Sequence, residues 1–171
     1  MDQRNQTFVP HLLAVEAGTA VDFPNSDRIS HNVFSNYDGQ VFDLHLYAPE
    51  ASRRVVFRRP GIVRVFCNIH ESMSAVIAVL DTPYFTVTGA DGRFEIQAPA
   101  GGYRLRFWQE RSRADLLGKL EQPITLGETG MTLSETRISL GVPQDEAHKN
   151  KFGQDYSPAP EGHVFYPGGR R

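Results

Sequence analysis

The sequence predicts an all-β protein, and three observations support this fold class. Short runs rich in Val, Ile, Phe and Thr recur along the chain, as they do in half-buried strands. Gly, Pro, Asn and Asp separate these runs, and these residues favour turns. A helical pattern is confined to residues 112–120, where Gly118 weakens it. We therefore expect sheets joined by tight turns.

The first half of the chain contains six expected strands, at residues 11–15, 19–23, 31–35, 53–57, 62–66 and 75–80. Turn residues lie between them, at Gly18, Pro24, Asn25, Asp38, Gly39, Pro60 and Gly61. We expect a domain boundary near residues 81–83 and a single β-sandwich over residues 1–81.

A second, shorter series of strands is expected after this boundary, at residues 84–88, 93–97, 103–108 and 131–140. Asp91 and Gly92 indicate a hairpin, because Asp-Gly tolerates the positive φ of a tight turn. These strands would form a smaller β-unit over residues 82–140. Residues 141–171 are a polar tail containing several Pro and Gly, which we expect to be irregular or to lie over the rest of the protein.

Composition excludes several classes of protein. The 171-residue chain has one cysteine, which rules out an intrachain disulfide, a four-cysteine zinc ribbon and a centre bridged by two thiolates. The net charge of −2 gives no reason to expect nucleic acid as a partner. The longest apolar run, at residues 75–80, is far shorter than the ~20 residues of a membrane-spanning helix. The first residues lack the pattern of a signal peptide, so we expect either a cytosolic protein or a mature chain to which Met1 was added.

Residues 66–73 (FCNIHESM) contain the pattern that points to chemistry. Cys67, His70 and Met73 lie between two expected strands at the spacing C-x2-H-x2-M. A thiolate, an imidazole and a thioether suit copper in its two redox states, whereas Ca2+ and Mg2+ prefer oxygen. A site with two His, one Cys and a weak Met needs a second imidazole, and His31 at the start of an expected strand is the best candidate. The alternative is that these are ordinary core residues, since buried Cys and Met and structural His at strand ends are common.

The same residues resemble a known family. Together with residues 21–25 (VDFPN), residues 31–35 (HNVFS) and the pair Pro60-Gly61, they look like the cupredoxins, the type 1 copper proteins that include plastocyanin and amicyanin. The resemblance is closer to the bacterial plastocyanin-like or methylamine-utilisation proteins, and it covers nearly all of residues 7–80. It implies a Greek-key β-sandwich that binds one type 1 copper.

The resemblance also implies roles for individual residues. The equatorial copper ligands would be His31, Cys67 and His70, and the axial ligand would be Met73. Asn32 would hydrogen-bond between the two ligand-bearing segments and hold the site rigid without metal. His148 and His163 lie outside this pattern, either as an accessory metal site or as part of a solvated tail.

The remainder of the chain resembles companions of this family. Residues 82–108 look like the transthyretin-like or carboxypeptidase-regulatory β-domain that follows such cupredoxins, and residues 148–156 (HKNKFGQDY) look like their C-terminal segment. His45 stands where relatives often carry Gly. Alternation would place His45 on one strand face with Asp43 and Tyr47, as a fifth ligand, a group that contacts a ligand, or a surface residue.

The pattern favours an electron carrier over an enzyme. Four protein donors leave no open position for a substrate. The neighbours of Cys67 are Phe66 and Asn68 instead of His, and the chain has no His-x-His pair, which argues against a multicopper oxidase. We expect single-electron transfer between redox partners, in the periplasm by family resemblance. The alternatives are a copper-handling module in which the metal is cargo, and a part of a copper oxidoreductase.

A cluster of arginines suggests where a partner would bind. Arg53, Arg54, Arg58 and Arg59 make the segment around them basic. This Arg53–Arg59 face would dock an acidic redox protein and speed its encounter. The alternative is an exposed strand whose charges discourage edge pairing.

Overall fold

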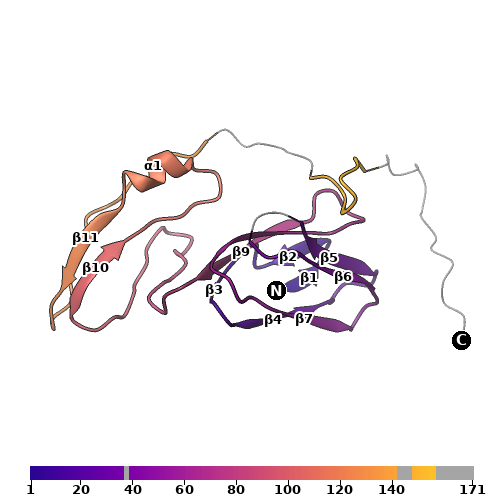
Figure 1. Ribbon diagram of the computed structural model, residues 1–171, viewed down its shortest axis with the longest axis horizontal. Coiled ribbons are helices and arrows are strands. Elements are labelled where there is room, and N and C mark those ends of the chain that lie inside the picture. Colours follow the sequence, from indigo (N-terminus) through magenta and orange to yellow (C-terminus); the bar gives the residue numbers. More distant parts are fainter. Residues whose placement is uncertain (37–38, 142–147, 157–171) are drawn as a thin grey trace, which may run out of the picture. The chain divides into compact units, whose positions relative to one another are not determined.

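Alternating apolar side chains in the first 82 residues build a β-sandwich, drawn in indigo to magenta in Figure 1. The computed structural model describes residues 1–36, 39–141 and 148–156. These residues fall into two units. Unit 1 contains residues 1–82 and 148–156, and unit 2 contains residues 83–141.

A five-stranded sheet forms one layer of unit 1. Its strand order is β3 (Leu12–Glu16), β9 (Ser74–Leu80), β8 (Gly61–Phe66), β5 (His31–Ser35) and β6 (Phe42–Tyr47). β3 runs parallel to β9, and the other neighbours are antiparallel. β8 and β9 are thus neighbouring inner strands of the sheet, and the loop that joins them lies at one end of the sandwich.

The second layer is the antiparallel pair of β4 (Ala20–Pro24) and β7 (Ser52–Val56). Next to it, β1 (Asp2–Arg4) pairs with β2 (Thr7–Val9), and Gln3 bridges to Asn25. The core between the layers contains side chains with no exposed surface, among them Phe23, Val33, Phe57, Val63 and Val65. Burial of each such side chain stabilises the fold by about 1.5–3 kcal/mol.

The all-β prediction is confirmed in unit 1. Each of the six expected strands is present within one residue of its expected bounds. Three described strands of unit 1, β1, β2 and β6, are missing from the six expected ones. β1 and β2 have three residues each, which is too short to show alternation, and β6 is indicated only by the expected alternation of Asp43, His45 and Tyr47.

β6 contains a β-bulge that changes which side chains face the core. Between the pairs Asn32–Leu46 and Phe34–Asp43, β6 has one residue more than β5. His45 adopts φ 54 at this point and is exposed, whereas Tyr47 is buried. The expected alternation across Asp43, His45 and Tyr47 is therefore wrong, since it does not continue through the bulge.

Unit 2 contains less regular structure than the sequence predicts. Its described residues form one antiparallel pair, β10 (Gly101–Leu105) with β11 (Gln122–Leu126), and one short helix, α1 (Ala114–Gly118). The helix lies within the stretch that shows a helical pattern. No helix among the described residues of either unit is long and apolar enough to cross a membrane.

Three of the strands expected in unit 2, at residues 84–88, 93–97 and 131–140, are not formed. Asp91 and Gly92 do form the expected turn, with Gly92 at φ 78. In the described part of unit 2, the buried side chains are Leu105 and Leu117, so little apolar surface is available to hold further strands. The transthyretin-like domain stays a prediction.

Candidate metal centre

The loop between β8 and β9 brings Cys67 and His70 together. The Cys67 N–H donates to the Met73 carbonyl at 3.1 Å, and the Met73 N–H donates to the His70 carbonyl at 3.1 Å. These bonds close the loop tightly across its base. Cys67 Sγ lies 3.6 Å from His70 Nδ1 as a result.

β5 supplies His31 to the same place. Its strand lies beside β8, where Phe34 pairs with Phe66. His31 Nδ1 lies 3.8 Å from Cys67 Sγ, and the two imidazole centroids are 4.9 Å apart. The donor atoms of His31, Cys67 and His70 all lie within 4.8 Å of one another. The fold therefore gathers the three expected equatorial donors from two segments that are distant in sequence.

Burial distinguishes the four residues expected as ligands. His31, Cys67 and Met73 have 0 % exposed surface, whereas His70 is half-buried. Met73 belongs to the same core cluster as Cys67. Of these four side chains, His70 is the one that reaches the surface.

Asp27 fixes the orientation of His31. Its Oδ2 atom lies 2.8 Å from His31 Nε2, which leaves Nδ1 directed toward Cys67. Burial opposes ionisation of Asp27, but the N–H groups of Gln6 and Asn5 and the His31 ring hold the pKa of its carboxyl below the usual value. A carboxylate on the second nitrogen of a ligand imidazole fixes the tautomer and makes the ligand more basic. Asp27 lies outside the pattern that indicates the metal site in the sequence, and its position four residues before His31 is the available signal.

The surroundings of Cys67 act on its thiol in opposite directions. Burial raises the pKa of the Cys67 thiol, while the backbone N–H groups of Ile69, Asn32 and His70 favour the thiolate. Burial also lowers the pKa of His70, with a smaller effect from His31. A neutral imidazole and N–H groups directed at sulfur are both suited to binding a cation at this point.

Asn32 connects the segments that carry His31 and Cys67 in two ways: its backbone N–H is directed at the Cys67 sulfur, and its side chain makes a longer link. Its Nδ2 atom donates to Asp43 Oδ1 on β6 at 2.7 Å. Asp43 Oδ2 accepts from Lys151 Nζ at 2.7 Å, and the Lys151 N–H donates to Asn68 Oδ1 at 2.9 Å. The side-chain link therefore runs through Asp43 and Lys151, and neither residue is indicated as a part of the site by the sequence.

Two other histidines, His45 and His148, lie outside the group formed by His31, Cys67 and His70. His45 is exposed, and its Nδ1 atom lies 3.3 Å from Asp43 Oδ2. His148, which the sequence placed in a polar tail, has only 8 % exposed surface and packs on Phe66 with ring centroids 4.3 Å apart. A solvated position for His148 is therefore wrong. The other tail histidine, His163, lies outside the described residues.

The donor set fits one type 1 copper. Two imidazoles, one thiolate and a buried thioether nearby are the ligands of a blue-copper electron-transfer site. Elsewhere in the described ranges, no second group of three or more His, Cys, Asp or Glu lies close enough together to hold a metal ion.

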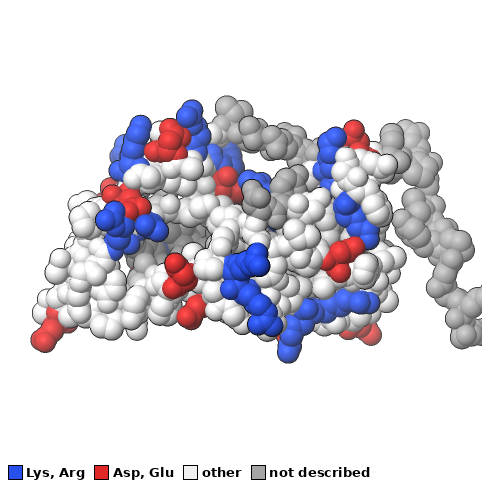
Figure 2. Space-filling view, in the orientation of Figure 1, with Lys and Arg blue, Asp and Glu red and all other residues white. Residues whose placement is uncertain are grey.

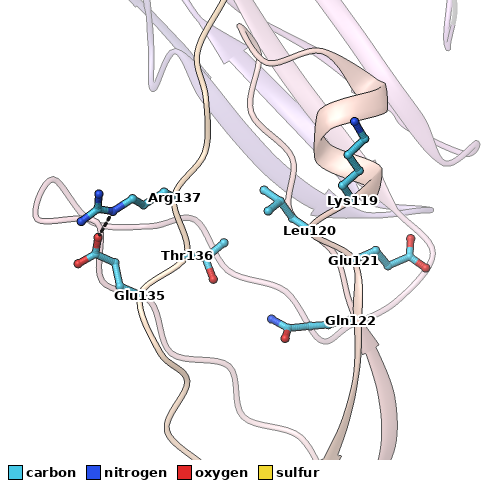
Figure 3. Close-up of a pocket in the computed structure, with 7 residues that line it drawn as sticks. All are labelled: Lys119, Leu120, Glu121, Gln122, Glu135, Thr136 and Arg137. Atoms are coloured by element: carbon cyan, nitrogen blue, oxygen red, sulfur yellow. Dashed lines mark hydrogen bonds and ion pairs between the residues drawn. The ribbon is translucent and has the colours of Figure 1, made fainter.

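A hollow lies in unit 2 (Figure 3). It has a volume of about 330 Å³ and lies between residues 119–122 and residues 135–137. Its lining is mostly polar, and Arg137 pairs with Glu135 at 2.8 Å. No Cys or His lines it, so it offers no comparable metal site.

Comparison with known proteins gives partial likenesses. No known family profile matches the chain. Over 59 residues the chain is 42% identical to the methylamine utilization protein MauL of Methylorubrum extorquens, a match that covers 34% of this chain and 52% of that protein. The chain thus spans about half the length of this curated relative.

Several solved copper proteins are similar to part of the chain. A copper-containing nitrite reductase from Thermus scotoductus is 23% identical, with a TM-score of 0.45, over 47% of this chain and 22% of that one. A purple cupredoxin from Nitrosopumilus maritimus is 25% identical, with a TM-score of 0.38, over 42% and 79% of the two chains. A reduced amicyanin variant is 20% identical, with a TM-score of 0.44, over 46% and 78%.

Proposed function

We propose that the protein is a copper-binding electron carrier that transfers single electrons between redox partners. In this proposal His31, Cys67 and His70 bind one copper ion and Met73 is the weak axial ligand. The convergence of three donor atoms within 4.8 Å, two of them on fully buried side chains, carries the proposal. Partial identity to a methylamine utilization protein supports it.

When bound, copper supplies one-electron chemistry, because both of its redox states accept these ligands. The chain's own contribution is to hold the donors in place. His31 is held by Asp27, Cys67 is fixed between two central strands, and the surrounding core side chains have almost no exposed surface. Donors fixed in this way change position little, which favours rapid electron transfer.

Accessibility favours a carrier over the alternatives. His31 and Cys67 have no exposed surface, so a substrate has no direct route to them. His70 is half-buried and offers a route for an electron without exposing the metal to solvent. A copper-handling module would have to release its metal, and deep burial of two donors works against rapid release.

The Arg53–Arg59 face is the proposed docking surface for an acidic redox protein. Figure 2 shows basic side chains gathered over the part of unit 1 that contains β7. Arg54 is paired with Asp22 at 2.6 Å, and the Arg53 guanidinium lies 5.5 Å from the Tyr47 ring centroid. Arg58 and Arg59 are exposed and provide the remaining positive charge. We place the protein in the periplasm on the family resemblance alone.

Titration of the metal-free protein with Cu(II) tests the site. We expect an intense visible thiolate-to-copper band, which Cys67→Ser abolishes and which the exposed-residue control His45→Gln leaves in place. A colourless complex, or a band that survives Cys67→Ser, would contradict the proposal. Rapid, reversible reduction with copper retained supports a carrier, whereas loss of Cu(I) to a mild chelator would favour the cargo alternative. Turnover of a substrate by the loaded protein would favour an oxidoreductase.

A further inference from the structure

The chain returns to the metal centre after it has passed through unit 2. Residues 148–156, here called the return segment and drawn in yellow in Figure 1, belong to unit 1 although they follow unit 2 in sequence. Their contacts concentrate on the residues around Cys67. Phe66, Cys67 and Asn68 are three consecutive residues, and each contacts a different residue of the return segment.

Tyr156 binds the backbone of Cys67. Its hydroxyl donates to the Cys67 carbonyl at 2.6 Å, across 89 residues of sequence. This carbonyl belongs to the first peptide group of the Cys67–Met73 loop. The bond is partly buried, so its loss would remove this hydrogen bond from the Cys67 carbonyl and loosen the start of the loop.

Lys151 connects both ligand-bearing segments at once. Its backbone N–H donates to Asn68, the residue after Cys67, and its ammonium group binds Asp43, which accepts from Asn32, the residue after His31. The ammonium–carboxylate distance is 2.7 Å, and both side chains are largely buried, with 24% and 29% exposed surface. A charge-assisted bond in this setting is stronger and better defined than an exposed ion pair.

His148 and an internal turn give the return segment a defined shape. The His148 ring lies between Phe66 and Tyr156, with centroid distances of 4.3 and 5.2 Å. Asn150 Oδ1 accepts from the N–H groups of Phe152 and Gln154, and the Gly153 N–H donates back to the Asn150 carbonyl. Gly153 has φ 77, which glycine adopts without strain. Because the turn is closed by its own bonds, Lys151 and Tyr156 are presented to the loop together.

We propose that the return segment is a positioning element of the metal centre, in which Tyr156 and Lys151 hold the Cys67–Met73 loop from its backbone side. This inference rests on the proposed copper site. Because the segment contacts the loop and not the donor atoms, its role is to keep Cys67 and His70 at the spacing that retains the metal. Docking of the segment and retention of copper then favour each other by the same factor.

Tyr156→Phe in the full chain tests the proposal, because it removes one hydroxyl and keeps the ring that packs on His148. Tyr103→Phe is the matched control, since Tyr103 donates to the Pro99 carbonyl at 2.8 Å in unit 2. We expect Tyr156→Phe to speed transfer of Cu(I) to a chelator roughly tenfold or more, in the range found when outer partners of metal ligands are removed. Tyr103→Phe should leave the rate unchanged, and equal rates in the two variants would overturn the proposal.

A second pair of variants lies within the return segment. Lys151→Met should also speed copper release, whereas Lys149→Met should not, because the Lys149 ammonium faces the exposed Asp155 at 3.6 Å. Faster release from both variants to the same extent would overturn the role of Lys151. The contact between Lys151 and Asp43 would then have no effect of its own on the rate of copper release.

Amide hydrogen exchange separates this inference from the proposed function. In metal-free protein, Tyr156→Phe should speed exchange of the Cys67 amide, which closes the loop on Met73, while Tyr103→Phe should not. This comparison needs no copper, so it holds or fails even if the visible band never forms in the wild type. In the loaded wild type, copper should slow exchange of the Lys151 amide. Unchanged Cys67 exchange in Tyr156→Phe would overturn the proposal.

Discussion

Units 1 and 2 begin from similar sequence patterns and reach different structures. Both contain short runs rich in β-formers separated by turn residues. In unit 1 these runs pair into two layers that enclose a core. In the described part of unit 2 they yield one strand pair, and large side chains such as Val87 and Trp108 keep 48% and 38% of their surface exposed.

This difference shows what a strand pattern alone does not determine. A run of β-formers becomes a stable strand when a second apolar layer covers its face, since packing on neighbours dominates strand preference. Unit 1 has that layer in β4 and β7. The proposed metal donors lie in the well-packed unit, where strands and core fix their positions.

The largest expected effect tests whether the buried core of unit 1 contributes more to stability than the partly exposed side chains of unit 2. Phe57→Ala removes a side chain with no exposed surface and should lower the free energy of unfolding of unit 1 by about 3–5 kcal/mol. Phe94→Ala in unit 2, where the ring is 37% exposed, should cost much less. Denaturant unfolding followed by amide exchange in each unit measures both. An equal loss of unfolding free energy in the two variants would show that burial does not distinguish the cores of the two units.

Asp27→Asn should have the next largest effect, on copper affinity. The amide cannot hold the His31 ring as the carboxylate does, so copper affinity should fall roughly 10–100-fold. Asp115→Asn in unit 2 removes a carboxylate that binds Arg113 at 2.9 Å and should leave the affinity unchanged. Competition with a chelator of known affinity measures both variants. An unaltered affinity in Asp27→Asn would mean that β5 and the core alone orient His31.

The pH dependence of stability should also differ between the units. Burial opposes ionisation of Asp43, but bonds from Lys151, His45 and Asn32 hold its pKa below the usual value. A carboxyl with a lowered folded-state pKa contributes stability above its unfolded value of about 3.9, and this contribution is lost as the pH falls through the folded value. Asp43→Asn should therefore flatten the fall in stability of unit 1 below about pH 4.

Glu121 is the counterpart in unit 2. Bonds from Arg104 and Arg106 lower its pKa, but both arginines are largely exposed and screened by solvent. Glu121→Gln should therefore have little effect on how far the stability of unit 2 falls as the pH is lowered. Unfolding measured at a series of pH values between about 6 and 3 compares the two substitutions, and a larger change in Glu121→Gln would reverse the expected order.

Six strands of unit 1 and the grouping of His31, Cys67 and His70 could be predicted from the sequence because both depend on local signals. Their role as metal ligands stays a prediction. The spacing of Cys67, His70 and Met73 indicates a metal site, and His31 is indicated by its place at the start of an expected strand. Lys151 and Tyr156 give no such signal, since they reach the site from 83 and 89 residues away through bonds to Asn68 and to a backbone carbonyl. The strands expected in unit 2 failed for a related reason, because their formation depends on a covering layer that no local pattern reveals.

The smallest expected effect concerns His45, at the bulge in β6. Its φ of 54 is costly for a residue with a Cβ atom, so His45→Gly should raise the stability of unit 1 by less than about 1 kcal/mol. Glu50→Gly is a matched control, because Glu50 is also exposed and has φ 65.

Both variants should leave the visible spectrum of the copper-loaded protein unchanged, since the exposed His45 ring contacts Asp43 and lies outside the donor group. A spectral shift in His45→Gly that is missing in Glu50→Gly would instead place His45 in contact with the metal. The bulge would then carry a functional residue, and the donor group of unit 1 would extend beyond β5 and the β8–β9 loop.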